Sequence, residues 1–124
     1  MSMSIEITSI EEVGLPNYME TIIGTETYER DSPLLAKLKI LVKSEPQIDD
    51  LIFEIREQGD GSPSIDEYYE DQVFDEVQKL LSQNLNKKQK GRLSNELIGF
   101  FQMEAFKFWL GEKSIFPIKY NENI

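Results

Sequence analysis

Apolar residues recur at helical spacing along most of this chain, and polar residues occupy the positions between them. The pattern predicts helices over five stretches: residues 15–23, 34–42, 48–55, 64–81 and 93–110. Pro33 and Pro46 stand at helix starts, where proline is tolerated, and Gly24 follows the first predicted helix as a stop signal.

The last of these stretches, LSNELIGFFQMEAFKFWL, carries apolar side chains around nearly its whole circumference. A helix that is apolar on all sides is usually buried, so residues 93–110 are expected to form the central helix. Gly99 weakens a helix interior and is expected to allow a close contact between helices. Gly111 is expected to end the helix.

The two ends of the chain are harder to assign from the pattern. Ile5 and Ile7 alternate with polar neighbours as in a short strand, whereas Ser9 and Glu12 match a helix capping box. Strand and helix therefore both remain open near the N-terminus. Residues 114–120, SIFPIKY, are expected to be extended and to fold back on the helices.

Chain length and composition favour one folded domain. The chain has 124 residues, of which 40% are hydrophobic and 29% charged, as in an ordinary globular domain. Together with the periodicity, this predicts a single all-α domain over residues 1–124. It would be a compact bundle of about five helices with a buried C-terminal helix, and short extended pieces are allowed at the termini.

The charge balance bears on the partners of the protein. The chain holds 13 lysines and arginines against 23 aspartates and glutamates, which gives a net charge of −10 at pH 7. Such a chain repels nucleic acid and anionic membranes and attracts basic proteins. We therefore expect a basic protein partner, with neither nucleic acid nor a membrane as the target.

Two residue types are missing, which excludes several chemistries. The sequence contains neither cysteine nor histidine. This excludes disulfides, thiolate metal sites and cysteine nucleophiles, and it removes the commonest general base and transition-metal ligand. The N-terminal residues lack the pattern of a signal peptide, and no apolar run reaches the length of a membrane span. A soluble, cytoplasmic protein without a cofactor is expected.

Carboxylates are the remaining candidates for metal binding or catalysis. The stretch DGSPSIDEYYED approaches a calcium-binding loop, but Ile65 occupies the place of the turn glycine and Asp71 that of the bidentate glutamate. A turn followed by a helix explains the same residues. Ser64 and Glu67 would cap that helix, and Phe74 would widen its apolar face, which is formed by Ile65, Tyr69, Val73, Val77, Leu80 and Leu81. Glu104, on the apolar helix, is the acid that a small carboxylate enzyme would use. The favoured interpretation is a protein that is not an enzyme and binds no metal.

The helix predicted over residues 64–81 carries an acidic ridge. Glu67, Asp71 and Asp75 recur every fourth residue on the side opposite the apolar face. Tyr68 points outward among these acids. Tyrosine is enriched at binding hot spots, and acidic surfaces speed association with basic partners. The predicted partner-binding residues are Asp66, Glu67, Tyr68, Glu70, Asp71 and Asp75.

The stretch DEYYED, residues 66–71, resembles the toxin-contacting surface of bacterial nuclease-toxin immunity proteins, where a tyrosine pair lies beside acids. These proteins, such as the colicin DNase immunity proteins, are small acidic helical bundles. The resemblance implies an inhibitor that blocks the basic active-site surface of a toxin nuclease by mimicking phosphates. The chain departs from that family in its greater length and in its apolar C-terminal helix.

An alternative of a different class remains open. The apolar stretch over residues 93–110 suits a regulatory or adaptor domain that associates with itself through this C-terminal segment. The inhibitor needs no dimer, so the pattern is compatible with both a monomer and a weak dimer.

Overall fold

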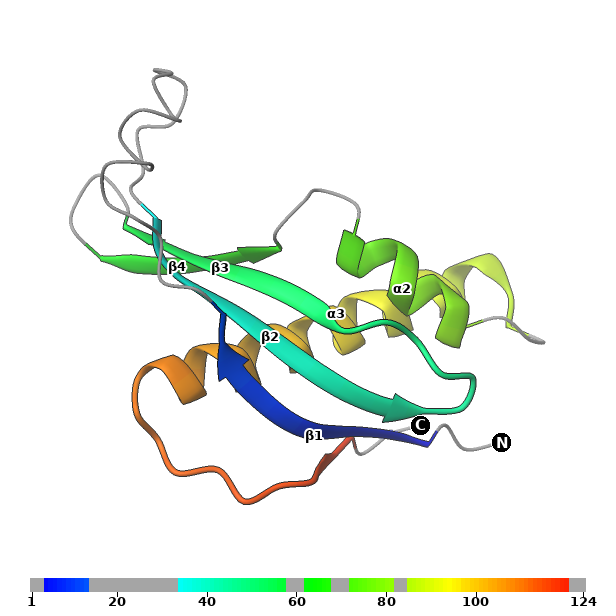
Figure 1. Ribbon diagram of the computed structural model, residues 1–124. Helices are drawn as coiled ribbons and strands as arrows, with labels where there is room; N and C mark the ends of the chain where they lie inside the picture. Colours follow the sequence, from blue (N-terminus) through cyan, green and yellow to red (C-terminus); the bar gives the residue numbers. More distant parts are fainter. Residues whose placement is uncertain (1–3, 14–33, 58–61, 68–71, 82–84, 121–124) are drawn as a thin grey trace.

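The computed structural model describes residues 4–13, 34–57, 62–67, 72–81 and 85–120 of the chain. Within them, an antiparallel sheet of five strands is covered on one face by two helices (Figure 1). In chain order the elements are β1 (Ile5–Glu12), β2 (Leu34–Ser44), β3 (Leu51–Glu57), β4 (Pro63–Glu67), α2 (Gln72–Leu80), α3 (Lys87–Trp109) and β5 (Ile118–Lys119). Neither of these helices is long and apolar enough to cross a membrane.

The prediction of an all-α bundle is wrong, because two of its helices are strands in the interior of the sheet. β2 and β3 stand where helices were predicted over residues 34–42 and 48–55. The buried residues of β2 are Ala36, Leu38, Ile40, Val42 and Ser44. They alternate with less buried residues, which is the period of two that a strand requires. Several of the same leucines also fit helical spacing, so the sequence pattern matched both structures.

β3 alternates only weakly, because Glu54, between two core residues, is buried as well. Phe53, Glu54 and Ile55 are consecutive, and all three are buried. A strand that is buried on both faces cannot be told from a helix by periodicity alone. The Glu54 carboxylate lies 2.9 Å from the guanidinium of Arg56, which offsets the burial of its charge.

Opposite charges stand at facing register positions on the sheet face that points away from the helices. The strand order is β4-β3-β2-β1-β5, and each neighbouring pair described by its register is antiparallel. Lys43 of β2 stands opposite Glu6 of β1. Lys39 likewise stands opposite Glu11. Such cross-strand pairs favour one register over its neighbours, so these charges serve the sheet itself.

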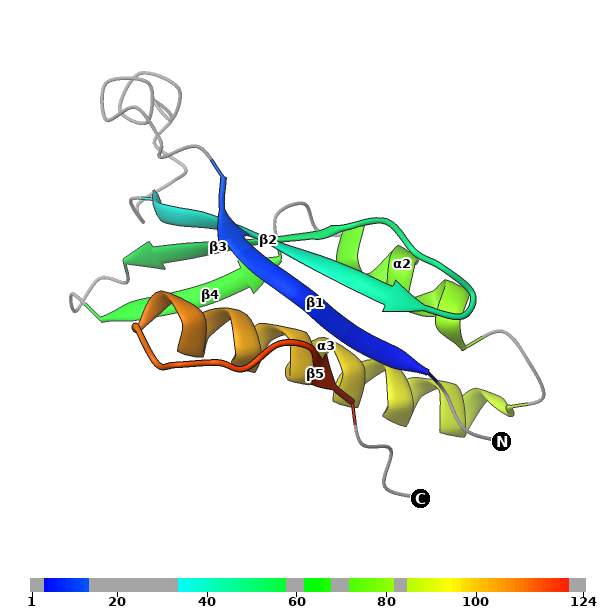
Figure 2. The same cartoon turned by 60° about the horizontal axis from the view of Figure 1, so that its bottom comes forward.

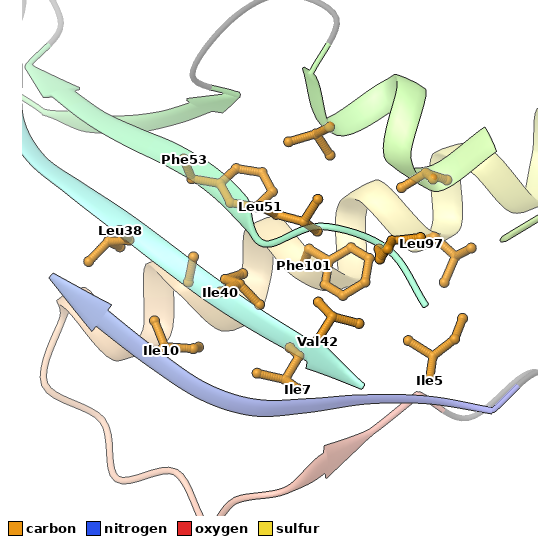
Figure 3. Packing of buried hydrophobic residues seen from close by; sticks show 14 of the residues in the cluster. Ile5, Ile7, Ile10, Leu38, Ile40, Val42, Leu51, Phe53, Leu97 and Phe101 are labelled. Carbon is orange, nitrogen blue, oxygen red and sulfur yellow. The ribbon is translucent and has the colours of Figure 1, made fainter. Parts of the chain in front are cut away.

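The hydrophobic core fills the space between the sheet and the helices (Figure 3). Side chains of β1, β2 and β3 point toward α3, which contributes Leu97 and Phe101, each 0% exposed. Val73 and Val77 of α2 are also fully buried in this cluster. Burying one large apolar side chain contributes about 1.5–3 kcal/mol, so this layer is the main source of stability.

The helix predicted over residues 64–81 divides into a strand and a shorter helix. β4 pairs with β3 at the edge of the sheet, and α2 follows it. The capping box proposed for Ser64 and Glu67 is therefore wrong, because both residues lie in the strand. The apolar face predicted for the helix is confirmed at Val73, Val77 and Leu80. Phe74, which was expected to widen that face, is 46% exposed.

α3 begins earlier than predicted, and its end is confirmed. Asn86 caps the helix: its side-chain oxygen accepts from the Gln89 N–H at 2.8 Å, and the Gln89 side chain accepts from the Asn86 N–H at 3.0 Å. This capping box starts the helix ahead of residue 93. The helix ends at Trp109, and Gly111 follows with a φ of 88°, a conformation that favours glycine.

The expectation that this helix is buried on all sides is wrong. Its buried residues lie along one face: Leu93, Ser94, Leu97, Phe101 and Ala105. Figure 2 shows α3 running along the sheet as an outer layer. A helix in that position is covered by the sheet on one side, and its opposite side points away from the core.

The two ends of the described chain meet at one edge of the sheet. The N-terminal ambiguity resolves as a strand, because β1 pairs with β2 over most of its length. The extended C-terminal segment is confirmed: β5 pairs with β1, and the Tyr120 N–H donates to the Ile5 carbonyl at 3.0 Å. The helix predicted over residues 15–23 lies outside the described residues.

Candidate binding site

The structure separates acids that the sequence placed on one helical ridge. Asp66 and Glu67 belong to β4, where they stand at register positions opposite β3. Asp75 lies on α2 and is exposed. Outside the described residues lie Tyr68, Glu70 and Asp71. The prediction of one continuous helical ridge is wrong, because a strand carries one end of it and a helix the other.

Two polar side chains attach α2 to the backbone that leads into β3. The Gln72 amide donates to the Asp50 carbonyl at 3.0 Å, and its oxygen accepts from the Ile52 N–H at 3.3 Å. One turn later, Glu76 accepts from the Asp49 N–H at 2.9 Å. These contacts satisfy backbone groups at the start of β3, and they hold α2 in a defined position against the sheet.

Glu76 is the buried charge at this junction. Burial raises the pKa of the Glu76 carboxyl, but the Asp49 N–H and the Lys79 ammonium outweigh burial and hold that pKa below its ordinary 4.5. The Lys79 ammonium donates to the carboxylate at 3.0 Å. This hydrogen bond raises the pKa of Lys79, and the charges of Asp49 and Asp75 add to the rise.

The same junction presents exposed acids to solvent. Asp49, Asp50 and Asp75 are all exposed, and we call them the acidic corner. Asp50 makes a long contact of 3.9 Å with Lys39. In the part of the chain that the structure describes, no group of three or more acidic side chains is arranged to hold a metal ion. Because its three aspartates are negatively charged, the acidic corner can attract basic groups, as the net charge of the chain suggested.

The outward side of α3 carries a second, apolar surface. Its residues recur at helical spacing on the side away from the sheet: Gly99, Met103 and Leu110. We call them the apolar seam. Met103 is 60% exposed and Leu110 53% exposed, although both are large apolar residues. On a helical wheel the seam lies opposite Leu97 and Phe101, which face the core.

The C-terminal segment covers one flank of α3. The ring of Tyr120 packs against Phe100 with 5.2 Å between centroids, and its hydroxyl donates to Glu96 at 3.2 Å. On the other flank, the ring of Phe106 lies 6.0 Å from the ring of Trp109, and both residues pack against the core. The seam therefore runs between two flanks that the protein has already packed.

Gly99 makes no close packing contact among the described residues. A side-chain carbon built at this position would meet nothing within 4 Å. Glycine in the middle of a helix is nevertheless weaker than alanine by about 1 kcal/mol. The close helix contact predicted for Gly99 is therefore not made within the described residues.

Sequence reasoning pointed to residues 93–110 as an interface but missed Met103 and Leu110 as its exposed members. These two residues were missed because the sequence did not reveal the sheet. An outer helix is covered on one side only, whereas a central helix is covered all round. Glu104, the acid considered for a small enzyme, pairs with Lys107 at 3.6 Å on the same helix. Comparisons with known protein families, curated proteins and solved structures found no match to this chain.

Proposed function

We propose that this protein is a non-catalytic binding domain whose contact surface is the apolar seam of α3. One observation carries the proposal: large apolar side chains at helical spacing are exposed on a helix whose other face builds the core. Exposed apolar patches mark sites of protein interaction. A helix that presents anchors at such spacing suits the groove or the helix of another protein.

The energetics favour a role in binding over a role in the fold. Each large apolar side chain that leaves water contributes about 1.5–3 kcal/mol. Met103 and Leu110 forgo most of that contribution in the isolated chain, since each is more than half exposed. A protein partner that covers these two side chains recovers that free energy.

A photoreactive side chain placed at position 103 tests this role in the cells that make the protein. We expect a discrete crosslinked protein, identifiable by mass spectrometry. The matched control carries the same group in place of Lys43, an exposed residue on the opposite face of the sheet. The proposal fails if position 103 gives no discrete product, or only the products of position 43.

The second candidate is an immunity-type inhibitor that blocks the basic active-site surface of a toxin nuclease. The acidic corner favours it, because three exposed aspartates gather where α2 meets β3. The other predicted contacts of this inhibitor are Asp66, Glu67, Tyr68, Glu70 and Asp71. Electrostatic attraction of this kind weakens as salt screens the charges.

Charge reversal tests the inhibitor. The chain with Asp49→Lys, Asp50→Lys and Asp75→Lys serves as bait beside the natural chain, at low and at high salt. We expect a basic nuclease to bind the natural chain at low salt, to elute at high salt, and to be lost with the reversed chain. A nuclease captured equally by both chains would place the contact elsewhere.

A further inference from the structure

We propose that the basic start of α3 is a docking surface for an acidic segment of another protein. Four cations lie within six consecutive positions there, and we call them the basic cluster: Lys87, Lys88, Lys90 and Arg92. Met103 of the apolar seam lies about 16 Å further along the helix axis than Arg92. The basic cluster is therefore a separate surface, and its role does not depend on that of the seam.

The charges at the described helix ends agree with the helix dipole except at the start of α3. α2 has Asp75 in its first turn and Lys79 in its last turn. α3 has Lys107 in its last turn, but it has no acid in its first turn. A cation beside the positive end of a helix is repelled by the helix dipole. The start of α3 is therefore electrostatically unfavourable in the isolated chain.

The cations of the cluster also repel one another. Residues three or four positions apart are neighbours on a helix surface, and like charges at that spacing destabilise the helix. Lys87 and Lys90 are three positions apart, and Lys88 and Arg92 are four positions apart. Lys87, Lys88 and Arg92 are exposed, so an anionic partner can reach them.

Among the described residues, no acid forms an ion pair with this cluster. The ion pairs of the described chain hold other cations, among them Lys39, Arg56, Lys79 and Lys107. Glu96 stands one turn after Arg92, but its carboxylate accepts from the Tyr120 hydroxyl at 3.2 Å. An acidic partner would supply the counter-charges that the described part of the chain does not provide.

Two features favour a protein segment over nucleic acid. The stretch from Asn86 to Asn95 contains no aromatic residue on which a base could stack. The net charge of −10 repels the dense and extended charge of nucleic acid. The basic cluster spans about 8 Å along the helix axis, which about three residues of an extended chain can cover. A short run of glutamates or aspartates fits this surface.

Binding of a fluorescent hexaglutamate peptide, followed by anisotropy, tests the surface with the full chain. We expect the natural chain to bind the peptide at low salt and to release it as salt is raised. The variant with Lys87→Glu, Lys88→Glu and Arg92→Glu should bind at least roughly tenfold more weakly, because like charges then face the peptide. Failure of the natural chain to bind hexaglutamate would overturn the proposal.

The matched control reverses three exposed lysines elsewhere: Lys43, Lys113 and Lys119. It changes the net charge by the same amount and should bind hexaglutamate far better than the cluster variant. Equal weakening by both variants would mean that only the net charge matters and would overturn the proposal. A single-stranded DNA of six nucleotides is the competing probe. Tighter binding of this DNA than of hexaglutamate would assign the cluster to nucleic acid and exclude the acidic segment.

The stability of the cluster variant tests whether these cations serve the fold. Its glutamates would lie at the positive end of α3, so the denaturant midpoint of unfolding should rise above that of the natural chain. The control variant should not show this rise. A lower midpoint in the cluster variant would show that the cations stabilise the start of α3 and would overturn the proposal. Neither measurement involves position 103, so a negative result leaves the proposed role of the apolar seam unaffected.

Discussion

The two faces of α3 contain similar residues and serve different purposes. On the inward face, Leu97 and Phe101 are 0% exposed. On the outward face, Met103 is 60% exposed and Leu110 53% exposed. Residue type does not distinguish the faces, but the layer opposite them does, since the sheet covers the inward face. Changes on the inward face should therefore alter folding stability, and changes on the outward face should alter association.

Truncating the inward face should have the largest effect. Phe101→Ala removes a fully buried ring from the core and should lower the free energy of unfolding by about 3–5 kcal/mol. Denaturant titration at a fixed, low protein concentration measures this loss of free energy of unfolding. The matched control is Phe74→Ala on α2, whose side chain is 46% exposed and should contribute far less. Comparable losses in the two variants would contradict the assignment of the core.

The same contrast applies to two neighbouring acids on α2. Glu76→Ala removes the acceptor of the half-buried Asp49 N–H, and the loss of such a hydrogen bond lowers the free energy of unfolding by about 0.5–1.5 kcal/mol. Asp75→Ala, one residue earlier on the exposed side, should change it by less than about 0.5 kcal/mol. Thermal unfolding of both variants checks this difference. A larger loss for Asp75→Ala would show that the acidic corner stabilises the fold.

The pH dependence of stability should report Glu76. Its pKa in the folded protein is lowered, so the carboxylate contributes stability above its ordinary value of 4.5, and this contribution is lost as pH falls through the lowered folded pKa. The free energy of unfolding should therefore fall less steeply on acidification in Glu76→Gln than in the natural chain. Denaturant titrations from neutral to acidic pH measure both slopes. Identical slopes would mean that Glu76 does not titrate as the contacts imply.

Gly99→Ala should move stability and association in opposite directions. The added methyl group meets nothing within the described residues, so the helix should gain about 0.5–1 kcal/mol in the free energy of unfolding. The same methyl group should hinder the close approach of a partner to the apolar seam. Denaturant titration measures the first effect, and the yield of the crosslink at position 103 measures the second. A gain in stability without weaker association would remove Gly99 from the interface.

Met103→Lys should have the smallest effect on folding. Its side chain is 60% exposed, so the free energy of unfolding should change by less than about 0.5 kcal/mol. The variant should nevertheless lose binding of a protein partner to the apolar seam. A marked loss of stability in the monomer would show that Met103 belongs to the core and would erase the contrast between the faces.

Local signals in the sequence were sufficient for parts of the helices and for the C-terminal segment. The apolar positions Val73, Val77 and Leu80 were predicted correctly because a helix buries residues at a spacing set by its own geometry. Gly111 was predicted as the end of α3 for an equally local reason, its freedom to adopt a positive φ. The folding back of residues 114–120 is likewise confirmed by β5.

For the candidate site, the sequence showed which types of residue are present but not how they are arranged in space. The apolar character of residues 93–110 was visible, and so was the excess of acids. Which apolar residues face outward depends on what packs against the helix. Which acids lie together depends on whether residues 64–81 form one element or two. Both questions are answered by contacts between segments that are distant in the sequence.

The sequence by itself determined that the chain has enough apolar residues for a core, where α3 ends, and that the net charge is strongly negative. The tertiary structure decided that residues 34–44 and 51–57 are strands. The physical reason is that a strand is stabilised by its neighbours: β2 pairs with β1 far upstream as well as with β3. Once that sheet had formed, its one covered face decided which side of α3 became core and which side remained open to a partner.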